Sequence, residues 1–161
     1  VGLGFGNIVG GQMLSLMLIG GVFSRLIFGF VADNLGGLKT LMIGSALQCL
    51  ALFLYLPFDG LVPLYIVSFL FGLSQGGIVP SYAIVVREFM PEDQAGAKIG
   101  FVVMSTIIGM AFGGLLSGWI FALTGSYSAA FINGIVWNCF NFAIIGFLYI
   151  NSKKAFLLEK K

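Results

Sequence analysis

The sequence predicts an all-α integral membrane protein, and three observations lead to that class. The 161-residue chain is 59% hydrophobic and 9% charged, and it contains no histidine. Several of its apolar runs reach the roughly 20 residues that a helix needs to cross a bilayer. These runs are apolar on every side, whereas a membrane β-strand alternates apolar and polar residues over about ten positions. We therefore expect a bundle of membrane helices.

Five membrane-spanning helices follow from these runs, and they form one transmembrane bundle within residues 1–150. The expected spans are residues 8–32, 38–57, 61–86, 99–124 and 127–150, and residues 151–161 form a basic tail. The number of spans is odd and the chain opens with Val1, so we expect a fragment of a larger protein. No basic segment precedes the first apolar run, so we expect no signal peptide.

The basic residues outside the spans predict the orientation, because Lys and Arg collect on the cytoplasmic side of short loops. Seven of them fall on one side of the bundle: Lys39, Arg87, Lys98, Lys153, Lys154, Lys160 and Lys161. The connections on the other side carry only Asp59. We expect the first residue outside and the tail in the cytoplasm. The net charge of +2 reflects this topology and indicates no nucleic-acid partner. Short loops and a short tail favour the inner membrane of a bacterium.

Arg25 is the charged residue inside the first span, and it is the main candidate for binding a ligand. An arginine in mid-membrane costs about 2.5 to 3.5 kcal/mol, so such residues usually face a bundle interior or a wet cavity. Helical spacing places six residues on the face of Arg25, namely Leu18, Gly21, Val22, Phe28, Gly29 and Ala32, and much of this face is small. Gly21 would let a ligand approach the guanidinium. In the alternative, Arg25 only extends toward the nearby membrane surface.

The third span carries a second polar feature, with Ser68, Gln75 and Tyr82 at intervals of seven residues. Gly76, Gly77 and Pro80 lie in the same turns, and they free backbone carbonyls and bend the helix. Transporters place broken helices at binding sites, so Gln75 and Tyr82 are predicted to line a site. The alternative is an ordinary proline kink that serves interhelical packing.

The fourth span has small residues at every fourth position: Ser105, Gly109, Gly113 and Ser117. This spacing lets two helix backbones approach closely, either for static packing or for sliding. In the last span, Asn133, Asn138 and Asn141 are interpreted as hydrogen-bonded packing residues.

Three segments resemble the major facilitator superfamily of transporters. GGVFSRLIFGFVADNLGGLKTL, residues 20–41, is similar to a superfamily helix with its cytoplasmic signature loop. Gly29, Asp33, Gly36 and Lys39 match the signature, and Asn34 replaces its usual basic residue. Residues 72–90 and 113–127 resemble the C-terminal half of the monocarboxylate transporter and oxalate:formate exchanger branches. The resemblance implies that the five spans are helices eight to twelve of a twelve-helix transporter.

The resemblance also implies roles for single residues. Arg25 aligns with an arginine taken to bind the substrate carboxylate, whereas Gly21 stands where monocarboxylate transporters have an aspartate. No lysine occurs between residues 99 and 152, where the oxalate exchangers would have one. Asp33 would act as a conformational latch against the N-terminus of the fourth span, expected near Lys98. In the alternative, Asp33 only ends the first span. Residues 87–98 are expected to be a solvated loop, in which Pro91 and Glu92 could open a short interfacial helix.

The sequence gives little support to catalysis. It has no histidine, no cysteine pair at metal spacing and no pair of carboxylates within the spans, so we expect no catalytic site, metal or cofactor. We expect part of a secondary transporter that moves a small organic anion by alternating access. Its partners would be the anion, the lipid bilayer and a missing N-terminal bundle of helices. The alternatives are a structural membrane subunit and a superfamily transporter of an unrelated solute.

Overall fold

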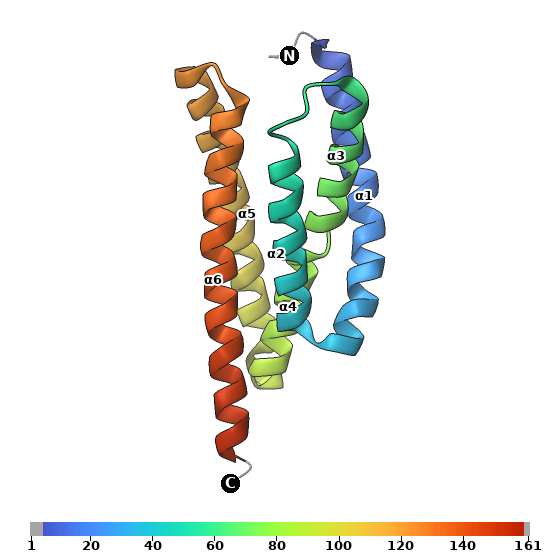
Figure 1. Cartoon of the computed structure of the whole chain (residues 1–161). Coiled ribbons are helices and arrows are strands. Elements are labelled where there is room, and N and C mark those ends of the chain that lie inside the picture. The colour runs from blue at the N-terminus through green and yellow to red at the C-terminus, as the bar shows by residue number, and fades with distance from the viewer. Residues whose placement is uncertain (1–4, 160–161) are drawn as a thin grey trace.

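The computed structural model describes residues 5–159, and their side chains through Ser152. Within this range all regular structure is helical, which confirms the all-α prediction (Figure 1). The helices are α1 (Gly6–Leu35), α2 (Gly37–Leu54), α3 (Leu61–Gln75), α4 (Ile78–Phe89), α5 (Glu92–Thr124) and α6 (Tyr127–Glu159).

Five segments of the described chain are long and apolar enough to cross a membrane, as the sequence predicts. Helices α3 and α4 together make one of these segments, Leu61–Phe89, and each of the other four is a single helix. Because the number of crossings is odd, α1 begins at one end of the bundle and α6 ends at the other (Figure 1).

Helix α2 lies at the centre of the bundle and contacts α1, α3, α4 and α6. Helix α1 packs mainly on α3 at one side of α2, whereas α5 and α6 lie at the other side (Figure 1). Within the described residues, α1 makes no contact with α5 or α6. An apolar cluster joins α2, α4 and α6 through Leu38, Leu41, Ile78 and Ile145. The bundle therefore has two outer pairs of helices connected by α2 and α4.

Glycines form two of the tight connections between helices. Gly36 joins α1 to α2 with a φ of 83°, and Gly125 ends α5 with a φ of 66°. A side chain is strained at such positive φ values, which glycine adopts readily. Gly76 and Gly77 separate α3 from α4, and Pro80 lies in the first turn of α4, where a missing N–H breaks no helical hydrogen bond.

The segment expected to be a solvated loop and most of the basic tail are helical in the structure. The prediction of a loop over residues 87–98 is wrong, because α4 continues to Phe89 and α5 begins at Glu92. Pro91 caps the start of α5, and Glu92 and Asp93 occupy its first turn, where the helix dipole stabilises negative charge. The tail is also helical as far as Glu159, the last described residue. Charged residues stay hydrated in helical turns that extend past a membrane surface, so charge alone does not end a helix.

Candidate functional site

Helices α1 and α3 meet along glycines that allow almost direct backbone contact. A methyl group added to Gly20 would lie 2.6 Å from the backbone oxygen of Phe69. A methyl group at Gly72 would overlap the backbone of Met17, and one at Gly76 would overlap the backbone of Gly21. We call this contact the glycine seam. It fixes the position of the helix that carries Arg25.

Arg25 lies on α1 directly after Ser24, which is fully buried, and its own side chain is exposed. No lysine or arginine of residues 5–152 lies within 4.0 Å of a carboxylate oxygen, so this cation has no acidic partner in that range. Unlike Arg25, Gly21 lies on the glycine seam, where its backbone faces Gly76. Helix α3 therefore covers part of the small-residue face of α1 on which the sequence predicts a ligand.

The two polar residues predicted to line a site occupy different environments. Gln75 is half-buried at the last position of α3, directly before the break between α3 and α4. The hydroxyl of Tyr82 donates to Asn141 Oδ1 of α6 over 3.4 Å, and its ring packs against the α2–α4–α6 apolar cluster. In this structure Tyr82 is therefore a contact between helices, and its role toward a ligand stays a prediction.

Helices α2 and α6 are joined by two side-chain hydrogen bonds inside the apolar bundle. Asn141 Nδ2 donates to Ser45 Oγ over 2.9 Å, and Asn138 Nδ2 donates to Gln48 Oε1 over 2.9 Å. These bonds confirm that Asn138 and Asn141 are hydrogen-bonded packing residues. The sequence analysis missed Ser45 and Gln48, because the pairing is set by the antiparallel register of two helices about ninety residues apart.

At the other end of α2, a carboxylate that the sequence analysis did not single out holds the signature loop. The backbone N–H of Gly37 donates to Glu88 Oε1 over 2.8 Å, and Glu88 lies near the end of α4. A carboxylate is stabilised at this position because the first N–H groups of a helix have no partner within the helix. No local signal could reveal Glu88, since it lies 51 residues from Gly37.

The predicted latch residues lie in the same part of the sequence as Gly37, and Gly36 lies close to the Glu88 carboxylate. Asp33 is exposed near the end of α1, and α1 makes no described contact with α5, whose N-terminus is its expected partner. Gly29 is half-buried, Gly36 forms the turn, and Lys39 is exposed in the first turn of α2 rather than in a loop. The latch stays a prediction. The helix N-terminus against which Asp33 would lie begins at Glu92, not near Lys98.

Helix α5 has no buried residue within the described chain. A methyl group added to Gly109 or Gly113 would meet no atom within 4 Å. Ser105 donates only to the carbonyl of Phe101 in its own helix. The small residues of α5 therefore form an open surface, in contrast with those of the glycine seam.

Comparison with known protein families identifies the fold. The model of the Major Facilitator Superfamily matches residues 2–158. The chain belongs to this superfamily. It is thus a multi-pass membrane protein and not an enzyme, and its five apolar helices form part of the superfamily fold.

Individual relatives within the superfamily carry transporter names. The chain is 25% identical to Monocarboxylate transporter 13 of Rattus norvegicus over 81% of its own length and 31% of that protein. It is 28% identical to "Probable anion transporter 3, chloroplastic" of Arabidopsis thaliana, over 93% of the chain and 28% of the relative. It is 25% identical to the Hexuronate transporter of Bacillus subtilis, over 89% and 33%. The chain spans about a third of the length of each relative, and no solved structure matches it.

Proposed function

We propose that this chain is part of a secondary active transporter that moves a small organic anion, such as a monocarboxylate, by alternating access. The observation that carries the proposal is Arg25, an exposed cation without an acidic partner in the described apolar bundle. The named substrates of its relatives support an anion, since monocarboxylates and hexuronates each carry a carboxylate.

Arg25 suits a carboxylate because a guanidinium donates two parallel hydrogen bonds to it. The same group is weakly hydrated compared with an ammonium, so it can lose water when an anion binds. The glycine seam holds α1 by backbone contact from Met17 to Gly21, about one turn before Arg25, and this support would keep the guanidinium in a fixed position. Gly21 and Gln75 would lie at the border of such a site, and Tyr82 would be reached through the break between α3 and α4.

The remaining wall of the site would come from an N-terminal bundle of helices that pairs with this one. In alternating access the two bundles rock about a substrate held between them. The small residues of α5 and the latch residue Asp33 would act in this rocking step. The expected membrane is the inner membrane of a bacterium, because the loops and the tail are short. The distribution of lysines and arginines supports a cytoplasmic tail.

Uptake of a labelled monocarboxylate by the full-length protein tests the role of Arg25. Arg25→Lys keeps the charge but loses the two parallel hydrogen bonds, so we expect uptake to fall about tenfold or more, and Arg25→Ala to lower it further. Arg87→Lys is the matched control, because Arg87 is exposed at the end of α4 and should tolerate the change.

Uptake is normalised to the amount of each variant in the membrane. Wild-type uptake by both Arg25 variants would exclude binding of the anion by the guanidinium. Absence of organic-anion uptake by the wild type, with normal insertion, would instead favour a structural subunit or a transporter of another solute.

A further inference from the structure

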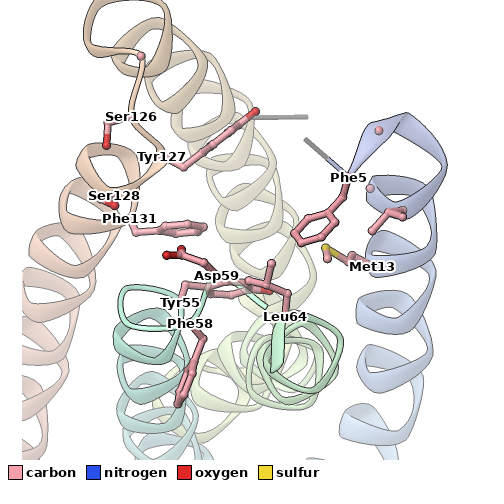
Figure 2. Close-up of a pocket in the computed structure, with 14 residues that line it drawn as sticks. Phe5, Met13, Tyr55, Phe58, Asp59, Leu64, Ser126, Tyr127, Ser128 and Phe131 are labelled. Atoms are coloured by element: carbon pink, nitrogen blue, oxygen red, sulfur yellow. The ribbon is translucent and has the colours of Figure 1, made fainter. Parts of the chain in front are cut away.

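A cavity of about 330 Å³ lies at the end of the bundle that carries the α2–α3 and α5–α6 connections. The first turns of α1, the connection after α2 and the start of α6 surround it (Figure 2). This cavity is remote from Arg25, which lies about 18 Å farther along α1 than Met13, the last residue of α1 that lines the cavity, at 1.5 Å per residue. It is therefore not the site proposed for the anion.

Aromatic residues line much of this cavity, and they come from separate parts of the chain: Phe5, Tyr55, Phe58, Tyr127 and Phe131. The ring of Phe58 is directed away from the others (Figure 2). Tyr55 and Phe131 stack with their ring centroids 4.7 Å apart. The hydroxyl of Tyr55 donates to Ser68 Oγ over 2.9 Å, which holds the ring in place. The aromatic wall is thus built by contacts between helices.

Asp59 supplies the one charged side chain of this wall, and its carboxylate lies beside Tyr55 and Phe131 (Figure 2). No Lys or Arg of residues 5–152 lies within 4.0 Å of the carboxylate. The described basic residues nearest in sequence are Lys39, at the opposite end of α2, and Arg87, near the end of α4. The negative charge therefore has no counter-ion from this bundle.

We propose that the cavity binds an organic ammonium group, with Asp59 as its counter-ion and the aromatic rings around its apolar substituents. Cations with attached carbon groups bind to the faces of aromatic rings, and aromatic cages recognise quaternary ammonium ligands in this way. A hard metal cation requires about six or more oxygen ligands, whereas this cavity offers one carboxylate and a few hydroxyl groups within a largely carbon surface.

The ammonium group has two possible sources, a free organic cation and the headgroup of a zwitterionic phospholipid. The location of the cavity at one end of the membrane-spanning helices makes both accessible. The charge of Asp59 disfavours an anion in this cavity, and the cavity is separate from Arg25, so this inference does not depend on the proposed transport function.

Binding of benzyltrimethylammonium to the full-length protein in nanodiscs tests the proposal by calorimetry. We expect the Kd to rise about fivefold or more in Asp59→Asn, which keeps the shape and removes the charge. Phe131→Leu should raise it about threefold, since one ring face is lost. Asp93→Asn is the matched control, because Asp93 is an exposed carboxylate in the first turn of α5, away from the cavity.

A neutral probe in which carbon replaces the ammonium nitrogen should bind the wild type at least about fivefold more weakly than benzyltrimethylammonium. Equal affinity of the two probes, or an unchanged Kd in Asp59→Asn, would overturn the proposal. Displacement of the probe by sodium at equal concentration would also overturn it and indicate a metal-ion site. The folding of each variant is checked by its elution in size-exclusion chromatography.

The lipid composition of the nanodiscs distinguishes the two sources. If the headgroup is the natural ligand, the probe should bind more weakly in phosphatidylcholine nanodiscs than in phosphatidylglycerol nanodiscs. Anionic phosphatidylglycerol also attracts the cationic probe by its charge. In Asp59→Asn, only the difference caused by this membrane charge should remain. If the ligand is a free cation, wild type and Asp59→Asn should show the same dependence on lipid.

Discussion

The glycine seam between α1 and α3 and the open surface of α5 use the same kind of residue with opposite results. Gly20, Gly72 and Gly76 face a neighbouring helix so closely that no methyl group fits. Gly109 and Gly113 have the same spacing of four residues, yet no described atom lies within 4 Å of an added methyl group. Small residues at this spacing therefore permit close helix contact but do not determine whether a partner is present.

The largest expected effect is that of a methyl group in the glycine seam. Gly72→Ala should lower the free energy of unfolding by about 1–3 kcal/mol, because the added carbon overlaps the backbone of Met17. Gly109→Ala is its control, and it should be neutral or stabilising by up to about 1 kcal/mol through helix propensity. The thermal unfolding midpoint of the full-length protein measures both, and equal midpoints would contradict the seam.

A larger side chain on α5 tests whether its open surface acts in transport. Gly113→Leu should change the free energy of unfolding by no more than about 0.5 kcal/mol, because the Cβ of residue 113 points into open space in this bundle. Uptake by the full-length protein should nevertheless fall several-fold, since close approach to the other bundle is blocked. Normal uptake would mean that α5 faces only lipid, and Leu115→Ala on the exposed surface serves as control.

The signature loop offers a contrast between a contact that is present and one that is only predicted. Glu88→Ala removes the acceptor of the Gly37 N–H and should destabilise the protein by about 1 kcal/mol, as loss of a helix cap does. Asp33→Asn should leave stability and substrate affinity unchanged but lower the transport rate, if Asp33 is a latch. Melting midpoints and initial rates separate the two effects, and a normal rate in Asp33→Asn would favour a surface role.

The smallest expected effect concerns the hydrogen bonds between α2 and α6. Asn141→Leu removes the donor to Ser45 and should cost about 0.6 kcal/mol, the average for interhelical hydrogen bonds in membranes. Double-mutant cycles with Ser45→Ala measure this coupling directly. A coupling energy of zero would show that Asn141 contributes only by its volume.

The sequence alone determined the number of crossings, the presence of a cation in the first span and the turn in which the third span is interrupted. Each of these rests on local chemistry: apolar length, the cost of burying a charge, and the backbone of glycine and proline. The solvated loop expected over residues 87–98 was wrong because its charged residues were taken as signs of a loop. Pro91 does stand at a helix start, as its preference for the first positions of a helix indicated, but the helix that begins there is α5 itself.

Only the tertiary structure decided which surfaces meet. It paired Glu88 with Gly37 and Asn141 with Ser45, assigned Gly21 to the glycine seam, and placed the exposed Asp59 beside aromatic rings. The physical reason is that lipid tails are as apolar as leucine, so a membrane helix shows little difference between a face that contacts lipid and one that contacts protein. The partners of each face depend on shape and register between helices, and these are set by residues far apart in the sequence.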